Sequence, residues 1–335
     1  MDFKKALKFV SENAIYFVLV VLVLIIAFID SRFLSLTCLR DILIQSSTRM
    51  IIALGAFFAI LIAGADLSAG RMVGFAAVLS ASMLQAPNYL RLFYPNLPQL
   101  PLWVPILIAI LVGVLFGWIN GFLVSKFSLP PFIATLGTMV IIYGVNSIYF
   151  NMPPNDSQPI GGLRADFTEL GTGAFNIGSI SIPYILLIAI AATVFMWVLM
   201  NKTRFGKNCY AIGGNVNAAK VSGINVGKTT IIMFTIAGAL YALAGVLEAG
   251  RTGGATNNYG NGYEMDAIAS CVVGGVSTTG GVGTIQGIVA GVLILGVINY
   301  GLTFIGLNPY WQQIIKGLII VSAVAVDIRK FLAKK

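Results

Sequence analysis

The stretch AIYFVLVVLVLIIAFI, residues 14–29, decides the fold class. Its 16 consecutive residues carry no charge. As a helix rising 1.5 Å per residue they would span roughly 24 Å, just short of the ~30 Å hydrocarbon core of a bilayer. Lys4, Lys5 and Lys8 precede the stretch, and no small-residue cleavage site follows it. We therefore expect a retained membrane helix whose N-terminus lies in the cytoplasm.

The composition extends this conclusion to the whole chain. Apolar residues make up 58% of the 335 positions, charged residues only 10%, and the mean hydropathy is +0.90. Such a surface requires lipid as its solvent, so we expect one all-α, polytopic transmembrane domain over residues 1–335. Nine further apolar blocks bring the expected number of transmembrane helices to about ten: 50–63, 72–86, 102–124, 132–150, 182–200, 229–249, 267–276, 283–304 and 311–326.

The 21 Lys and Arg residues indicate the orientation in the membrane. When alternate loops are assigned to the cytoplasm, 13 of them lie inside, six lie outside, and Arg71 and Lys316 lie at or within helices. This asymmetry follows the positive-inside rule, so the net charge of +9 does not call for a nucleic-acid partner. The least regular part is 30–49, an expected outer segment with three Arg. Both termini are predicted to be cytoplasmic.

The two halves of the chain resemble one another. At an offset of 179 residues Asn120 aligns with Asn299 and Pro130 with Pro309 without a gap, and a similar offset of 186 aligns Ala53 with Ala239. We infer that the second to fifth helices, about 50–150, are repeated as the seventh to tenth, about 229–326. Five helices separate the copies, which therefore insert in opposite orientations, as in many transporters.

Some glycines recur at helical spacing. They stand four residues apart at 113, 117 and 121 and again at 283, 287 and 291. Small residues at this spacing form a smooth strip on one helix face, which lets a neighbouring helix approach closely. The pattern predicts close helix packing rather than chemistry.

Polar residues near breaks in the helices are the candidates for a transport path, because an ionisable group at membrane depth is costly unless it is paired or wet. Asp66 lies in GADLSAGR, 64–71, where it could cap the next helix or line the path with Arg71 as its charge partner. The polar run RTGGATNNYGNGYEMD, 251–266, suits a sugar, but its expected outer position suits a partner protein equally well. The candidates for the path or for partner contact are Asp66, Ser68, Arg71, Asn120, Thr135, Asn257, Asn258, Glu264, Asp266 and Asn299.

The cytoplasmic segment 201–228 is predicted to contain a short helix that Asn215 or Asn217 caps and Gly223 ends. A short exposed helix between membrane helices suits a groove in another protein, and a plain connector is the alternative. The residues assigned to this contact are Asn215, Asn217, Ala218, Ala219, Lys220, Val221, Ser222 and Gly223.

Several enzyme chemistries are excluded by the residues present. The chain has no His, and Cys38, Cys209 and Cys271 are too far apart for a disulfide framework or a metal-ligand pattern. The stretch SGINVGKTT, 222–230, resembles a phosphate loop, but a Ser replaces its first Gly and no strand precedes it. We therefore expect no catalytic residue, no metal and no nucleotide site in this chain.

The chain resembles the permease subunits of bacterial ABC importers for monosaccharides, the ribose, xylose and galactose group, over nearly its whole length. The stretches VINYGL, 297–302, and NPYWQQIIKG, 308–317, are most similar to the galactose and methyl-galactoside members of this group. The other stretches that carry the resemblance are GADLSAGR (64–71), LPPFIATLGTM (129–139), NKTRFGKNCYAIGGNVNAAKVSGINV (201–226), EAGRTGGATNN (248–258) and DAIASCVVGGVSTTGGVGT (266–284).

This resemblance implies a fold similar to the cobalamin-importer permease, placed as a multi-pass protein in the bacterial inner membrane. Its implied partners are a second copy of the permease, a separate cytoplasmic ATPase that binds ATP and Mg²⁺, and a periplasmic or lipid-anchored sugar-binding protein. The segment 217–223 then becomes a coupling helix, which transmits closure of the ATPases so that the cavity alternates between the two sides of the membrane.

The implied substrate is galactose, glucose or a methyl galactoside. A permease for ribose or xylose and an ion-coupled secondary transporter are the alternatives. The segments 86–101 and 151–181, which a binding protein would touch, look divergent from the galactose permeases.

Overall fold

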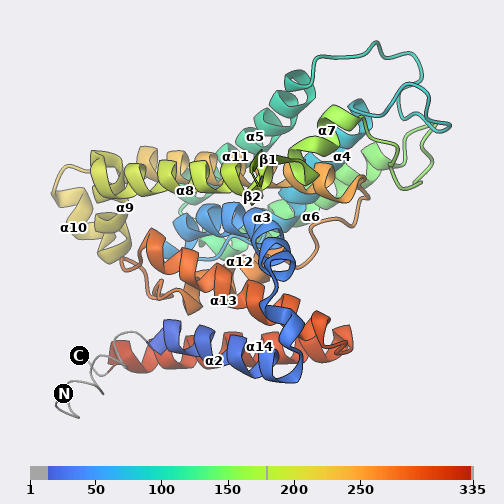
Figure 1. Ribbon diagram of the computed structural model, residues 1–335. Coiled ribbons are helices and arrows are strands. Elements are labelled where there is room, and N and C mark those ends of the chain that lie inside the picture. Colours follow the sequence, from blue (N-terminus) through green and yellow to red (C-terminus); the bar gives the residue numbers. More distant parts are fainter. Residues whose placement is uncertain (1–13, 179, 333–335) are drawn as a thin grey trace.

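The chain is built almost entirely from helices in the computed structural model, which describes residues 14–178 and 180–332 (Figure 1). Within these residues the only strands are β1 (Ala174–Ile177) and β2 (Ile180–Pro183), an antiparallel hairpin in which Ala174 pairs with Pro183. The helices are α2 (Ala14–Ile29), η1 (Ser31–Leu34), α3 (Leu36–Leu61), α4 (Ala69–Met83), α5 (Trp103–Lys126), α6 (Pro131–Phe150), α7 (Ala165–Thr172), α8 (Tyr184–Lys202), α9 (Arg204–Gly214), α10 (Val216–Val221), α11 (Val226–Thr252), α12 (Tyr263–Val273), α13 (Ile285–Phe304) and α14 (Pro309–Leu332).

The ten apolar blocks predicted from the sequence each coincide with one helix, in the expected order. Among the described residues, six of these helices are long and apolar enough to cross a membrane: α3, α5, α6, α8, α11 and α13. Helix α2 has 16 residues, α4 has 15 and α12 has 11, so each is shorter than a straight bilayer crossing. The chain is thus a polytopic helical membrane protein, and ten membrane crossings stay a prediction.

The segment 30–49, predicted as an outer loop, is helical over most of its range, and its outer position stays a prediction. Helix α3 begins at Leu36, where the Ser35 side chain accepts a hydrogen bond from the backbone N–H of Cys38, and it runs for 26 residues. Its polar first half is stable as a helix because other helices supply partners. Asp41 accepts a hydrogen bond from the Tyr300 hydroxyl at 3.1 Å, and Arg49 pairs with Asp266 at 3.3 Å.

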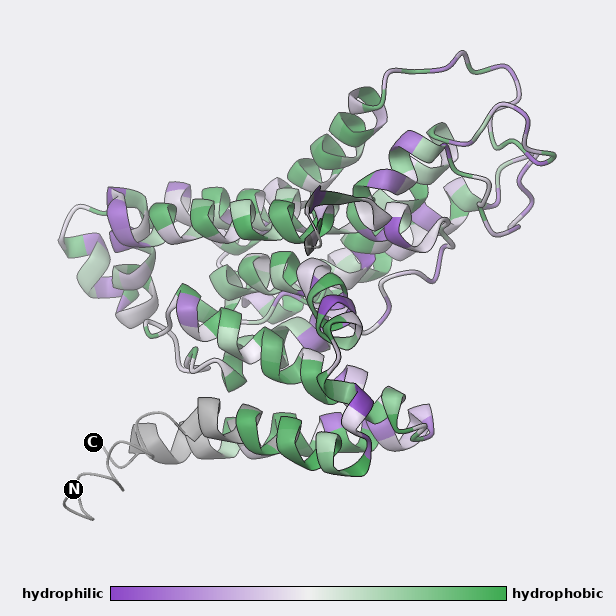
Figure 2. Ribbon diagram, in the orientation of Figure 1, coloured by the Kyte–Doolittle hydropathy of each residue, from purple (hydrophilic) through white to green (hydrophobic). Residues whose placement is uncertain are grey.

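Helices α3 and α11 form the centre of the bundle. Of the 18 residues that make up the most apolar part of each, 78% are buried in α3 and 67% in α11, against 28% in each of α5, α6 and α8. The outer three helices expose apolar side chains such as Val140, Ile148 and Val194, which lipid would cover. Figure 2 shows the same distribution, with apolar helices and more polar connecting segments.

The glycines of α5 allow the close helix packing that their spacing predicts. Gly113 and Gly117 face α11, and a Cβ atom placed on Gly117 would come within 2.3 Å of the carbonyl oxygen of Phe234. The second set acts similarly between α12 and α13, because a Cβ atom on Gly291 would meet the carbonyl oxygen of Ser270 at 2.0 Å. Backbone contacts require glycine at 113, 117, 121, 287 and 291, whereas a Cβ atom on Gly283 would meet the side chains of Phe57 and Val276.

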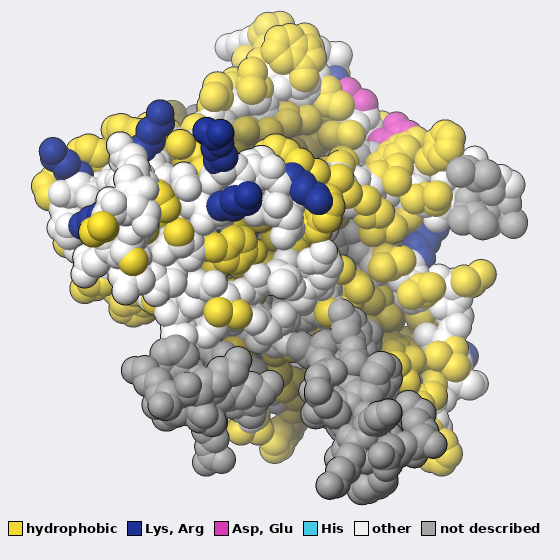
Figure 3. Space-filling view, turned by 90° about the vertical axis from the view of Figure 1, so that its left-hand side faces the viewer, with side chains coloured by type: hydrophobic (Ala, Val, Ile, Leu, Met, Phe, Trp, Pro, Cys, Tyr) yellow, Lys and Arg dark blue, Asp and Glu magenta, His cyan; other side chains and the backbone are white. Residues whose placement is uncertain are grey.

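The two ends of the bundle differ in character. Helices α9 and α10 lie at one end, and the loops around 84–102 and 151–164 lie at the other, together with α7 (Figure 1). The α9–α10 end is basic, as Figure 3 shows, and residues 170–247 contain no Asp or Glu. Its exposed cations are Lys126, Lys202, Arg204, Lys207, Lys220 and Lys228. The terminal cations Lys4, Lys5, Lys8, Lys334 and Lys335 lie outside the described residues.

Candidate functional site

A break in the chain between α3 and α4 holds the first group of candidate residues. Asp66 is 1% exposed, and its carboxylate accepts hydrogen bonds from Ser68, at 3.0 Å from the backbone N–H and at 2.5 Å from the hydroxyl. Ser68 is the N-cap residue of α4, so Asp66 stabilises the cap instead of being the cap itself. Thr135 of α6 secures the break, since its hydroxyl accepts from the Leu67 N–H and donates to the Ala65 carbonyl, both at 3.1 Å.

The same group continues into α5 and α6. The Asn120 amide donates to the Ser68 hydroxyl at 2.9 Å, and the Thr138 hydroxyl donates to the Asn120 side-chain oxygen at 2.6 Å. All of these side chains are at most 3% exposed. The structure therefore brings together Asp66, Ser68, Asn120 and Thr135, as a sealed network of neutral donors around one carboxylate. It fastens α4, α5 and α6 together and offers no surface to a solute in this conformation.

Sequence reasoning missed Thr138, although a signal for it existed. Thr135, Thr138 and Asn146 recur at offsets of 3 and 11 residues, which places them on one face of α6. A polar stripe on an otherwise apolar helix indicates buried or wet contacts. Asn146 is 1% exposed, and it donates to the carbonyl oxygen of Asn257 at 3.3 Å.

Arg71 does not pair with Asp66, contrary to the sequence-based hypothesis. Its guanidinium donates to the side-chain oxygens of Asn258 at 3.3 Å and Asn261 at 2.9 Å, and it lies 4.4 Å from the ring centroid of Tyr143. The irregular segment 253–262 places these amides against α4. Its Gly260 has φ +76°, and a Cβ atom there would come within 2.1 Å of the Gly70 carbonyl oxygen, so only glycine permits this approach.

The acidic residues of α12 belong to a third group of polar contacts, separate from those of Asp66 and Arg71. Glu264 is 8% exposed and packs against Gly70, where a Cβ atom would meet its Oε2 at 2.1 Å. Asp266 is shared by two cations, Arg49 of α3 at 3.3 Å and Lys316 of α14 at 3.2 Å. Asp266 thus lies between α3 and α14, and neither acid joins the Asp66 network.

Aromatic and ionic contacts extend this third group to α11. The Arg49 guanidinium lies 3.4 Å from the ring centroid of Tyr263, and the Tyr263 hydroxyl donates to Glu248 at 3.2 Å. Glu248 in turn pairs with Arg251 at 2.7 Å. Asn299 takes no part in any of the three groups through a hydrogen bond, because its side-chain oxygen is buried without a partner among the described residues.

The predicted short helix of the 201–228 segment exists as α10. The Asn215 side chain accepts from the Ala218 N–H at 3.0 Å, as a cap should, and Gly223 follows the helix with φ +79°. Asn217 lies inside the helix. Ala219 is buried against the protein, whereas Val221 is 91% exposed. The preceding helix α9 was missed because its sequence is rich in glycine and basic residues.

Helix α9 connects this end to the core. A Cβ atom on Gly213 would meet the Leu61 carbonyl oxygen at 2.0 Å, and that oxygen accepts a hydrogen bond from the Gly281 N–H at 2.8 Å. The Tyr210 hydroxyl donates to the Gly283 carbonyl at 3.0 Å. The end of α3, which precedes Asp66, is therefore in direct contact with the segment that carries α10.

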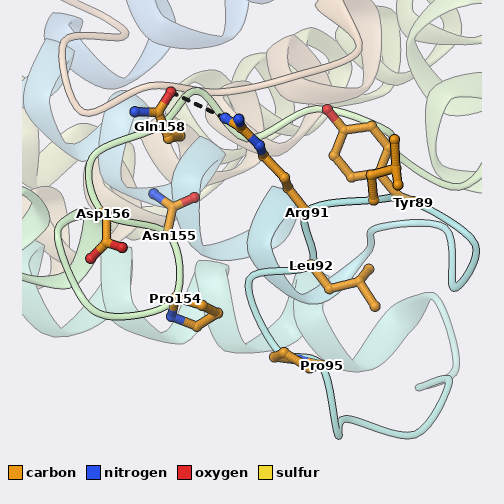
Figure 4. Close-up of a pocket in the computed structure, with 9 residues that line it drawn as sticks. Tyr89, Arg91, Leu92, Pro95, Pro154, Asn155, Asp156 and Gln158 are labelled. Carbon is orange, nitrogen blue, oxygen red and sulfur yellow. Dashed lines mark hydrogen bonds between the residues drawn. The ribbon is translucent and has the colours of Figure 1, made fainter.

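The opposite end of the molecule carries a cavity of about 540 Å³ between two loops (Figure 4). Arg91 crosses it and donates to the Gln158 side chain at 3.4 Å. Tyr89, Asn155 and Asp156 line it from the two loops, and neighbouring Leu90 is fully exposed. Aromatic, amide and charged groups are thus combined on one exposed surface.

The chain is similar to known permeases over its whole length. A family model described as the branched-chain amino acid transport system permease component matches residues 38–324. The galactose/methyl galactoside import permease protein of Haemophilus influenzae is 50% identical over 100% of this chain and 99% of its own. The protein of the same name from Escherichia coli is 52% identical over 99% and 98%. The ribose import permease protein of Bacillus subtilis is 38% identical over 93% and 91%. No solved structure matches the chain.

Proposed function

The chain belongs to the permease-component family whose model it matches, and from this premise we propose that it is the transmembrane permease subunit of an ABC importer for galactose and methyl galactoside. The observation that carries the proposal is an identity of about half the residues, across both full lengths, with permeases named for these sugars. Identity with the ribose permease is lower, at 38%, which favours a galactose-type substrate over ribose.

We infer that the chain works as half of a pair. Two copies would enclose one path across the bacterial inner membrane, with a sugar-binding protein outside and two ATPases inside. ATP and Mg²⁺ would be bound by the ATPases. The basic α9–α10 end supports the assignment of that end to the cytoplasm, by the positive-inside rule. The cavity lined by Tyr89, Arg91 and Asp156, at the other end, then faces the binding protein.

Helix α10 is the element we propose for contact with the ATPase. Val216 and Val221 are 42% and 91% exposed, which leaves two apolar side chains next to the Lys220 charge at the cytoplasmic end. Movement of α10 would pass through α9 to the end of α3 and the Gly281 turn, which are in contact. The break at 62–68 directly follows α3, so a displacement of α10 would be transmitted to the start of α4.

The substrate assignment is tested by uptake in a bacterial host that lacks its own importers for the sugars compared. The chain is expressed together with its ATPase and its binding protein, and the uptake of radiolabelled galactose, methyl galactoside, glucose and ribose is compared. We expect galactose and methyl galactoside to enter and ribose to remain outside. Uptake that prefers ribose, or that persists without the ATPase, would contradict the proposal.

The coupling role of α10 is tested by charge reversal at Lys220 and by a bulky replacement of Gly223. Lys220→Glu and Gly223→Val are expected to abolish sugar uptake, because they change the contact surface and the left-handed residue that ends α10, while the chain remains inserted in the membrane. Uptake and membrane content are measured in parallel. Lys126→Glu, at the same end but on α5, is the matched control and should retain most uptake. Normal uptake by the Lys220 and Gly223 variants would exclude this role.

A further inference from the structure

Arg71 and its neighbours form a polar surface patch, which comprises Arg71, Tyr143, Asn258 and Asn261 and adjoins the buried Asn146. Arg71 comes from α4, Tyr143 and Asn146 from α6, and the two remaining residues from the irregular segment 253–262. Asn258 and Asn261 are exposed, and Tyr143 is 39% exposed. The patch is therefore exposed on the surface of this chain, whereas the network around Asp66 is buried.

The patch lies deep in the bundle. Arg71 precedes the outer end of α4 by twelve residues (71 to 83), and Tyr143 precedes the outer end of α6 by seven (143 to 150). At 1.5 Å per residue these positions are roughly 18 Å and 10 Å below the outer ends of their helices. Arg71 has no ion-pair partner within 4.0 Å among the described residues. A charged group at such depth must face protein or water, because lipid does not solvate it.

The surroundings of the patch distinguish the lipid side of α6 from this side. Ile141 and Ile148 are 58% and 73% exposed, and with 100° per residue they lie about 140–160° around the helix from Tyr143. Leu136 and Val140, 39% and 61% exposed, lie about 20° and 60° from Tyr143. Tyr143 is therefore at the border between the exposed apolar side of α6 and the side that carries buried Asn146, and its hydroxyl needs water or protein as a partner at membrane depth.

The hydrogen-bonding groups of the patch are only partly used. Asn258 and Asn261 accept from Arg71 through their oxygens, so each presents an NH₂ group that has no partner in the described part of the chain. The Tyr143 hydroxyl also has no hydrogen-bond partner among the described residues. Asn146 is 1% exposed, and its buried side-chain oxygen has no partner in the same part of the chain. The two amide NH₂ groups and the Tyr143 hydroxyl and ring, around a guanidinium already bonded to two amides, match a neutral polyol better than an anion.

We propose that Arg71, Tyr143, Asn258 and Asn261 line the aqueous path of the importer and contact the monosaccharide hydroxyls as the sugar crosses. This inference rests on the proposed function for the identity of the sugar. Access of water to the patch does not depend on which sugar is carried, and it is measured without any sugar. Arg71 is positioned by its two amide bonds and by the Tyr143 ring, so these three partners set the shape of the contact surface.

The first experiment measures water access in membrane vesicles that contain the assembled importer. The three native cysteines are buried, so single substitutions can be compared in the natural chain. A charged, membrane-impermeant thiosulfonate should modify Asn261→Cys and Tyr143→Cys at least about tenfold faster than Ile141→Cys, because a thiol in lipid stays protonated and unreactive. Galactose with its binding protein and ATP should change the rate at 261. Equal, slow modification of all three variants would overturn the proposal.

The second experiment separates sugar contact from folding. Asn261→Ala and Tyr143→Ala should lower galactose uptake per ATP hydrolysed about tenfold while the binding protein still stimulates hydrolysis, and Tyr143→Phe should retain an intermediate rate. Ile141→Ala on the lipid face is the control and should match the natural chain. If uptake and stimulated hydrolysis fall together in the Ala variants, or if neither falls, the patch does not contact the sugar. Failure of the natural chain to import galactose would instead count against the proposed function.

Discussion

At the scale of single residues, most buried polar side chains of this protein are satisfied by a specific neighbour. Asp66 takes two hydrogen bonds from Ser68, and Asn120 bridges Ser68 to Thr138. Inside a low-dielectric bundle such bonds are costly to leave unmade, so each residue of the network depends on the next. Asn146 and Asn299 are exceptions, because the side-chain oxygen of each is buried without a partner in the described chain.

Replacement of Asn120 by Leu tests the sealed network. The variant loses the bonds to Ser68 and Thr138 and should be destabilised by about 1–3 kcal/mol. The thermal unfolding midpoint of the detergent-solubilised protein should fall. Thr193→Val is the control, because among the described residues the Thr193 hydroxyl bonds only to the Ala189 carbonyl of its own helix, at 2.8 Å. An equal midpoint for Asn120→Leu and Thr193→Val would contradict the structural role.

Cys209 should resist labelling over a wide pH range. Cys209 on α9 is fully buried, and burial raises the pKa of its thiol to about 12. An ordinary exposed thiol ionises near pH 8.5 and reacts faster as the pH rises from 7 to 9. Because the Cys209 pKa lies above that window, its thiolate fraction stays very small throughout. We expect no rise in the labelling of Cys209 between pH 7 and 9, as measured by mass spectrometry of the peptide that contains it.

At the scale of elements, α3 and α11 hold the bundle together. Both exceed 25 residues, and both are mostly buried by the shorter or more peripheral helices around them. Helix α5 approaches α11 closely because glycines face it at each turn. In a membrane this packing contributes stability that the hydrophobic effect alone cannot provide between apolar helices. The elements therefore depend on small residues at defined positions.

A pair of glycine substitutions tests this dependence. Gly117→Ala places a Cβ atom within 2.3 Å of the Phe234 carbonyl oxygen, so α5 and α11 must separate and stability should fall. Gly137→Ala on α6 meets nothing within 4 Å and should be neutral or stabilising by up to about 1 kcal/mol, since Ala favours helix more than Gly. Thermal unfolding midpoints of the two variants give the comparison. A Gly117 variant as stable as the Gly137 variant would disprove the contact.

At the scale of the whole molecule, ionic contacts join parts of the chain that are distant in sequence. Asp266 connects α3 to α14 through Arg49 and Lys316, and Tyr263 and Glu248 extend the group to α11. At the other end, α9 touches the end of α3 and the Gly281 turn. Helix α3 thus contacts both ends of the bundle, which makes it the element through which the two ends can influence each other.

Neutralising Asp266 should destabilise the folded protein more than removing one of the two cations that pair with Asp266. Asp266→Asn leaves Arg49 and Lys316 facing each other without a carboxylate, whereas Lys316→Met leaves the Arg49–Asp266 pair at 3.3 Å. All three side chains are partly exposed, so we expect a loss of about 1–3 kcal/mol for Asp266→Asn and less for Lys316→Met. Thermal unfolding midpoints of the two variants at low and high salt show which one loses more stability. The reverse order would refute the shared-carboxylate arrangement.

Local chemistry made several features predictable from the sequence. Long apolar stretches indicate membrane helices wherever they occur, the Asn215 cap acts on an N–H three residues away, and glycines at 113, 117 and 121 share a face through helix geometry alone. Residues that lack this local signal were misread. The first half of α3 looks like a polar loop until Asp266 and Tyr300 are placed beside it.

The sequence by itself therefore determined the class of the protein, the order of its apolar helices, the short helix α10 and the family resemblance. Only the tertiary structure decided which polar residues meet. Asn120 bonds to Ser68, 52 residues away, whereas the side-chain oxygen of its aligned counterpart Asn299 has no partner among the residues that the structure describes. Arg71 bonds to amides 187 and 190 residues away and not to nearby Asp66. The physical reason is that a hydrogen bond depends on distance and direction in space. Those are set by how glycines and breaks bring the helices together.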